Sequence, residues 1–481
     1  MKNDYMIRLL ALLAIVFAAC TGLYFLPDQA FGIKIKRVDL LSALRSDAHV
    51  RDSRMEALRA ELAEAEAPAT DSPASMSLAD SSAEVDSIAL AIALRDSITK
   101  DMAGIAAADH KGERIEDYSE GHNGLHRFFA ALNSSRTRPV RIAFVGDSFV
   151  EGDILTAGLR NSLQQSFGGR GVGFVPVTSE AARYRSTVSM TAAGWKTISI
   201  LTDKANSFIL SGLIFEPEEE NPSIKFKLGT MYAAIRRAGS LQLIYDRNVA
   251  TSVHLSCNAI ADTSLQLPPA DGISACTLRG DSISSGTITF EQGDGFRALG
   301  IVLEDETGVS VDNLALRGHS GLMWTKLDEQ TCSRWNAIRP YDLIILQYGL
   351  NVATEEVLDY SWYRGRMCES IARVRQCFPE ADLLLLGVSD RANRYDGSFA
   401  TMPAVLALLN AQRKIAVRMQ IPFWNTFGAM GGENSMLAYV DKGWAGKDYT
   451  HLSFRGGQEL ASALVKSLLN EKKQYEGGND R

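Results

Sequence analysis

Three short strings of the chain hold a hydroxyl, an amide and an imidazole in an order that could support one reaction. They are G-D-S at 146–148, G-L-N at 349–351 and D-Y-T-H at 448–451. A serine hydroxyl is a weak nucleophile until an imidazole takes its proton. A carboxylate three residues before a histidine can hold that ring in the required tautomer. These residue types predict ester hydrolysis through Ser148, His451 and Asp448.

Acyl transfer also needs donors for the negative oxygen of the tetrahedral intermediate. The backbone N–H of Ser148 and the side-chain amide of Asn351 are two candidates for this oxyanion hole. We expect a third from the N–H of Gly321, which follows a strand-like run at 309–316, although Gly169 or Gly171 could take that place.

Four polar residues near these strings have plainer expected roles. Asp147 is expected to cap a helix or to hold the turn before Ser148, and His319 to be a surface or a structural histidine. Glu151 and Asp153 could line a cleft or could be solvated carboxylates of a first helical turn.

The pattern of apolar residues places the three strings in an α/β domain. Buried strands are predicted at 140–145, 343–348 and 383–387, and helices at 155–167, 402–417 and 454–469. Their alternation predicts β-α-β units with a parallel sheet. From 184 to 313, short alternating segments separated by Gly, Pro, Asn and Asp predict an inserted β-sandwich.

The order of these residues resembles the SGNH (GDSL-type) hydrolases, above all a membrane-anchored or periplasmic branch of peptidoglycan O-acetylesterases. The likeness covers about 123–469 and is strongest in the first block at 146–176; Phe149 and Val352 depart from the wider family pattern. It implies a three-layer α/β/α domain and a carbohydrate-binding role for the insert. Ser148, Gly321, Asn351 and His451 would be the four name-giving residues, with Asp448 beside them.

Composition sets limits on the class of protein. The chain has 481 residues, a net charge of −7, 46% apolar and 22% charged residues, which is ordinary for a globular protein. It has no dense basic block, so we expect no nucleic-acid partner. We expect no catalytic metal, because the histidines lack ligand spacing, and no cofactor. A Cys257–Cys276 disulfide is a guess.

An uncharged run at 9–26 is just long enough to cross a bilayer as a helix. An uncleaved inner-membrane anchor is the leading interpretation, and a lipoprotein acylated at Cys20 or a cleaved signal peptide are the alternatives. Each of them exports the remainder of the chain. The expected order is anchor and flank at 1–37, helical stalk and linker at 38–115, hydrolase domain at 116–183 and 314–481, and insert at 184–313.

The sequence therefore predicts an extracytoplasmic serine esterase that removes O-acetyl groups from an envelope polysaccharide, with peptidoglycan as the expected substrate. Three alternatives stay open. One is an acetylesterase or acetyltransferase that acts on another exported polysaccharide through the same acyl-enzyme. The second is a glycan-binding envelope protein without catalysis. The third is a protein whose coiled-coil-like stalk docks a partner and whose hydrolysis is incidental.

Overall fold

The computed structural model describes residues 114–178, 185–291, 295–395 and 397–479, together with two short strands near the N-terminus. Those two strands, β1 (Gln29–Ala30) and β2 (Ile33–Lys34), pair antiparallel in a separate unit at 1–72. The expected membrane segment at 9–26 and almost all of the expected stalk lie outside the described residues. Among the helices that are described, none is both long and apolar enough to cross a membrane.

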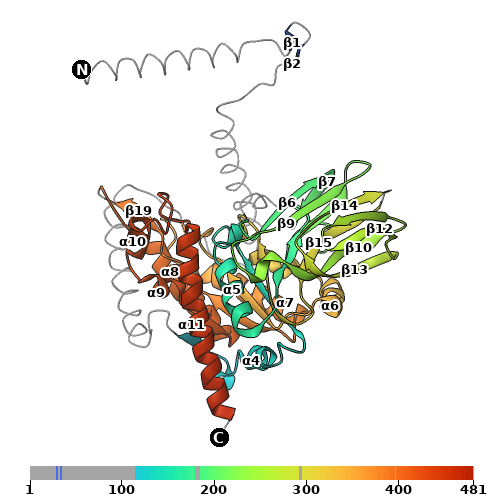
Figure 1. Cartoon of the computed structure of the whole chain (residues 1–481). Coiled ribbons are helices and arrows are strands. Elements are labelled where there is room, and N and C mark those ends of the chain that lie inside the picture. The colour runs from blue at the N-terminus through green and yellow to red at the C-terminus, as the bar shows by residue number, and fades with distance from the viewer. Residues whose placement is uncertain are drawn as a thin grey trace, which may run out of the picture. The chain divides into compact units, whose positions relative to one another are not determined.

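A six-stranded sheet forms the centre of the α/β domain (Figure 1). Five strands are parallel, and β3 pairs antiparallel at one edge. In sheet order they are β16 (Gly308–Ala315), β4 (Pro139–Gly146), β17 (Leu343–Gln347), β18 (Asp382–Leu386), β21 (Pro422–Trp424) and β3 (Ile115–Asp117). Parallel strands that are buried on both faces have continuous apolar runs in their sequence. This pattern is why β4, β17 and β18 could be predicted.

Two groups of helices cover this sheet. α4 (His126–Asn133) and α5 (Thr156–Phe167) contact the long C-terminal helix α11 (Phe454–Asn479), and Figure 1 shows α5 and α11 side by side. The second group is α6 (Glu329–Ile338), α7 (Ser361–Cys377) and α8 (Pro403–Met419). Right-handed crossovers between parallel strands put the two groups on opposite faces, as in a three-layer domain.

The order of the parallel strands reverses direction at one point, and such a point is suited to ligand binding. From β4 the chain moves to β16 on one side, and all later parallel strands lie on the other side. In such doubly wound sheets, ligands bind beyond the carboxyl ends of the two strands where the direction reverses, here β4 and β17. Ser148 follows β4 and Asn351 follows β17, so the fold itself brings two of the three strings together.

Two antiparallel sheets lie between α5 and β16 in the chain and share one hydrophobic core. In β9, Ile224 and Phe226 are buried while Lys225 and Lys227 are exposed, which is the alternation expected of a strand with one solvated face. The first sheet contains β5 (Gly171–Pro176), β7 (Trp195–Ser199), β8 (Leu213–Pro217), β10 (Ala238–Asn248), β13 (Ala270–Ile283) and β15 (Arg297–Glu304). The second contains β6 (Val188–Ala193), β9 (Ser223–Leu228), β11 (Ser252–Cys257), β12 (Ile260–Gln266) and β14 (Ser285–Glu291).

A buried cluster of charges joins the antiparallel sheets to the α/β domain. The Arg339 guanidinium lies 2.6 Å from Asp312 on β16 and 2.8 Å from Glu304 at the end of β15. Arg141 of β4 adds a second cation, 2.9 Å from Glu304. Burial acts to raise the pKa of Glu304, but Arg339 and Arg141 outweigh it and lower that pKa to about 2. The cluster therefore fixes β15 to the central sheet.

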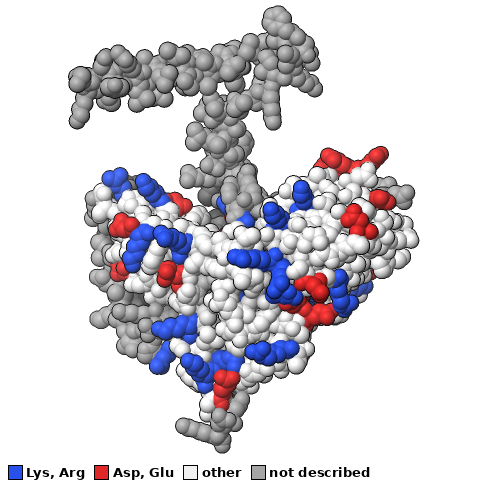
Figure 2. Space-filling model, viewed as in Figure 1, with Lys and Arg blue, Asp and Glu red and all other residues white. Residues whose placement is uncertain are grey.

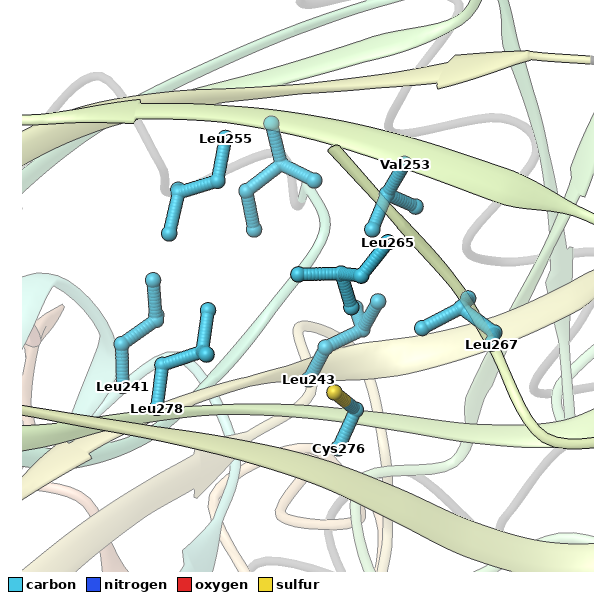
Figure 3. Close-up of a pocket in the computed structure, with 9 residues that line it drawn as sticks. Leu241, Leu243, Val253, Leu255, Leu265, Leu267, Cys276 and Leu278 are labelled. Atoms are coloured by element: carbon cyan, nitrogen blue, oxygen red, sulfur yellow. The ribbon is translucent and has the colours of Figure 1, made fainter. Parts of the chain in front are cut away.

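The core between the antiparallel sheets contains a small apolar pocket, which Figure 3 shows in close-up. Its lining is leucine-rich and includes Leu241, Leu255 and the Cys276 thiol. Cys276 belongs to β13 and Cys257 to β11, which lie in different sheets, and both are free thiols. The guessed Cys257–Cys276 disulfide is therefore wrong.

Charged side chains are interspersed on the outside of the molecule. Figure 2 shows basic and acidic groups on the same face with uncharged surface between them. Some of these form pairs across the surface, such as Arg170 with Asp305 at 2.6 Å and Arg279 with Glu306 at 2.5 Å.

Candidate active site

Ser148 lies in the tight turn that leaves β4. Asp147 forms this turn, since its Oδ1 accepts the Phe149 N–H at 2.9 Å, which confirms its expected role. A Cβ at Gly146 would lie 2.6 Å from the Val150 side chain, so only glycine fits the last position of the strand. The half-buried Ser148 side chain then faces His451, with 3.2 Å between Oγ and Nε2.

The D-Y-T-H string forms a short loop before α11. Oδ2 of Asp448 lies 2.7 Å from Nδ1 of His451, so the carboxylate holds the ring nitrogen that faces away from Ser148. Oδ1 of the same carboxylate accepts the backbone N–H groups of Thr450 and His451, each at 3.1 Å. The three side chains thus form a continuous chain from carboxylate to imidazole to hydroxyl, as a serine nucleophile requires.

The Asp448 carboxylate stays ionised across the ordinary pH range. Burial acts to raise its pKa, but the hydrogen bonds from the His451 ring and backbone and from the Thr450 N–H outweigh burial and lower the pKa to about 2. An ionised carboxylate beside Nδ1 fixes the proton on that nitrogen. Nε2 is then left as the acceptor for the Ser148 proton.

Asn351 contacts the residue that precedes the nucleophile. Its Nδ2 donates to Oδ2 of Asp147 at 3.1 Å and to the carbonyl oxygen of His319 at 3.0 Å. The amide is therefore oriented by the residue that precedes Ser148 and by the loop that follows β16. All three predicted strings meet at this edge of the sheet, together with the segment at 317–321 that contains Gly321.

His319 is fully buried against the rings of Trp324 and Tyr348, with ring centroids 4.5 and 5.2 Å away. Burial lowers its pKa to about 3, so the imidazole is neutral. Its Nδ1 lies 3.0 Å from the Gly321 backbone N and accepts that N–H, which assigns the ring proton to Nε2. His319 is thus a buried structural residue that contacts the loop next to Ser148.

The three glycines considered as oxyanion donors occupy different places. Gly321, with φ +92°, gives its N–H to His319, so it would have to break this bond to serve as a donor, and its role stays a prediction. Gly169 and Gly171 lie against Val309 and Leu303, near the amino end of β16. Because Ser148 lies beyond the carboxyl ends of the strands, the expectation that either could be the donor is wrong.

The sequence reasoning passed over a fourth glycine, Gly318. Ala315 pairs with Gly146 across β16 and β4, and the Leu316 N–H donates to the Gly146 carbonyl at 2.9 Å. Gly318 lies three residues beyond Ala315 and Ser148 lies two residues beyond Gly146, so both residues follow the carboxyl ends of these two neighbouring strands. Within the described part of the chain, neither of their backbone N–H groups has an acceptor. The signal that could have found Gly318 is its place in the loop that follows a predicted strand.

Glu151 and Asp153 are buried, so the expectation that they are solvated carboxylates is wrong. Glu151 pairs with Arg317, and Asp153 pairs with Arg185 at 3.1 Å. Burial acts to raise the pKa of Asp153, but Arg185 and Arg160 outweigh it and lower the pKa below its usual range. These pairs tie the segment after Ser148 to the β16 loop and to the start of the antiparallel sheets.

Comparison with known proteins gives a match of fold. A structure of a peptidoglycan O-acetylesterase is similar with a TM-score of 0.61 and 22% sequence identity, over 75% of this chain and 99% of that chain. A family two carbohydrate esterase from Cellvibrio japonicus matches at 11% identity over 60% of this chain and 99% of the other, with a TM-score of 0.26. No protein-family model matches the sequence, and no curated protein resembles it. The resemblance to O-acetylesterases predicted from the motifs is confirmed at the level of fold.

Proposed function

We propose that the chain is a serine esterase that removes O-acetyl groups from a polysaccharide of the cell envelope, with peptidoglycan as the substrate. The observation that carries this proposal is the hydrogen-bonded chain Asp448–His451–Ser148 at the point where the sheet reverses direction, with the Asn351 amide beside it. The apolar segment at 9–26 supports placing the enzyme outside the cytoplasm, where such a polysaccharide lies.

The first chemical step is acylation of the serine. Ser148 Oγ attacks the acetyl carbonyl while Nε2 of His451 takes the hydroxyl proton. Asp448 stabilises the imidazolium that forms. The tetrahedral intermediate then collapses, His451 gives its proton to the sugar oxygen, and the sugar leaves with a free hydroxyl. The acetyl group remains on Ser148.

The second step is hydrolysis of the acetyl-enzyme. The same His451 imidazole takes a proton from a water molecule that attacks the acetyl carbonyl, and it then gives that proton to Ser148 Oγ as the acetyl–Oγ bond breaks and acetate leaves. In both steps we assign the oxyanion hole to the N–H groups of Ser148 and Gly318 and to the Asn351 amide. Both Nδ2 hydrogens of Asn351 are engaged in this structure, so the oxyanion must take one of them from Asp147 or the His319 carbonyl.

Acetate release from two polymers tests the proposal. Purified protein is incubated with O-acetylated peptidoglycan or with acetylated xylan, next to Ser148→Ala and the matched control Ser166→Ala, whose hydroxyl bonds to a carbonyl within α5. Release from peptidoglycan that requires Ser148 and survives Ser166→Ala supports the proposal. Ser148-dependent release from xylan alone would support the serine esterase mechanism and reject peptidoglycan as the substrate. No Ser148-dependent release from either polymer rejects the esterase.

A further inference from the structure

The hairpin formed by β19 (Ala392–Tyr395) and β20 (Ser398–Thr401) contacts two loops of the candidate site. It leaves the sheet after β18 and lies near α10 (Ser435–Asp441), as Figure 1 shows. Its contacts show what it could do there.

One side of the hairpin contacts the loop that carries Asp448 and His451. The Ala392 N–H donates to the Tyr449 carbonyl at 3.1 Å. The Phe399 ring stacks on the Tyr449 ring with 3.8 Å between centroids and 14° between planes. Tyr449 is therefore held both by its backbone and by its side chain.

The backbone of Tyr449 determines how the Asp448 carboxylate is used. Its φ is +51°, in the left-handed region that bulky residues rarely adopt. This turn allows Oδ1 of Asp448 to accept the Thr450 and His451 N–H groups while Oδ2 holds the His451 ring. An unfavourable conformation at one residue persists only when its surroundings fix it, and the hairpin supplies two such contacts.

The hairpin segment also contacts the loop that follows Asn351. Nη1 of Arg391, which precedes β19, donates to the Ala353 carbonyl at 3.3 Å. Nδ2 of Asn393 donates to Oε1 of Glu355 at 2.6 Å. One element thus connects the loop of the proposed oxyanion donor with the loop of the proposed base.

The base of the hairpin is firmly attached. Oγ1 of Thr401 donates to Oδ1 of the buried Asp390 at 2.9 Å, and the Thr401 N–H donates to Oδ1 of Asn434 at 3.0 Å. Asp390 Oδ2 in turn accepts the Met436 N–H at 2.7 Å. These bonds tie the hairpin to α10, so it is a stable support for the loops that it contacts.

We infer that the β19–β20 hairpin holds the Asp448–His451 loop in its catalytic conformation, and that Phe399, through its stack on Tyr449, is a positioning residue for the base. This inference rests on the proposed function. Phe399 is 37% exposed, which is unusual for a large apolar ring and invites a rival role as a platform for a sugar ring of the substrate. The two roles predict different kinetics.

Three variants separate them. Phe399→Ala removes the stack, Phe399→Tyr keeps it, and Val417→Ala is the control, since Val417 is a 51% exposed apolar residue on α8. For each, kcat and KM are measured on a small acetyl ester and on O-acetylated peptidoglycan, with the melting temperature. We expect Phe399→Ala to lower kcat on both substrates by about 10- to 100-fold, because a misplaced base loses rate rather than binding. KM should stay within about twofold, and Phe399→Tyr should retain the activity.

Amide exchange gives a readout that does not need activity. In Phe399→Ala the Thr450 and His451 amides should exchange faster than in the wild type, while the rest of the α/β domain is unchanged. A rise in KM on the polymer alone would assign Phe399 to sugar binding and overturn the positioning role, as would unchanged exchange with unchanged kcat. If the wild type cleaves no ester, the proposed function fails, and the exchange result still decides whether the hairpin holds this loop.

Discussion

Oδ2 of Asp448 lies 2.7 Å from Nδ1 of His451, and the same carboxylate accepts the His451 backbone N–H through Oδ1. The two residues are only three positions apart, so one short loop supplies both the base and the group that orients it. About half of each side chain is exposed. The orientation of the ring therefore depends on these hydrogen bonds more than on enclosure by the core.

Asp448→Asn tests this dependence. The amide keeps the size of the carboxylate but loses its charge and can present an N–H to Nδ1, which favours the wrong tautomer of His451. We expect kcat to fall by about 10⁴-fold with little change in melting temperature. The control is Asp441→Asn, an exposed carboxylate at the end of α10, which should retain full activity. Retention of more than a tenth of the wild-type kcat in Asp448→Asn would contradict the assigned role.

Asn351→Ala removes one of the three proposed oxyanion donors. Because the donor acts on charge that develops in the transition state, we expect kcat to fall by about 10²- to 10³-fold with KM nearly unchanged. The variant also leaves Oδ2 of Asp147 and the His319 carbonyl without this partner, so circular dichroism should accompany the kinetics. A rise in KM at constant kcat would show that Asn351 binds substrate and does not stabilise the oxyanion.

His319 should make folding stability depend on pH. Its pKa is about 3 in the folded protein because of burial, and an unfolded histidine titrates near 6.5. The unfolded chain therefore binds a proton that the folded chain rejects, and stability falls as the pH drops from about 6.5 towards 3. Between pH 7 and pH 5 the wild type should lose about 2 kcal/mol more than His319→Asn, a variant that can still accept the Gly321 N–H. Urea unfolding at the two pH values measures this difference, and equal losses in both proteins would disprove it.

Arg339 should contribute strongly to stability. Arg339→Met leaves Asp312 without its guanidinium and Glu304 with Arg141 alone. Removing one partner of a buried ion pair typically costs 3–5 kcal/mol, so we expect a loss of about that size in chemical denaturation. Arg279→Met is the matched control, because Arg279 and Glu306 are 72% and 62% exposed and such surface changes stay within about 0.5 kcal/mol. Equal effects of the two substitutions would show that the buried cluster does not stabilise the fold.

Much of this arrangement could be predicted from the sequence. Strand β4 could be recognised because its apolar run is buried on both faces, and the turn at Asp147 and Ser148 because glycine and aspartate mark such turns. The Asp448–His451 pair could be predicted because both residues lie in one loop. In these cases the signal is local.

The remainder depends on contacts between distant parts of the chain. Gly318 and Gly321 both follow the β16 strand, and only the His319 ring, which accepts the Gly321 N–H, distinguishes them. The partners of Asp153 lie up to 160 positions away, so its burial has no local signature. The β19–β20 hairpin has strands of four residues, which are too short for a periodic pattern.

Trapping of the acetyl-enzyme tests directly whether Ser148 is the nucleophile. The protein is mixed with an activated acetyl ester, quenched in acid within the first turnovers and digested, and the peptides are examined by mass spectrometry. We expect one acetyl group on Ser148 that appears before steady-state turnover, and no acetylated peptide from Ser148→Ala. Steady ester cleavage with no acetyl group on Ser148, or with unchanged turnover in Ser148→Ala, would contradict it.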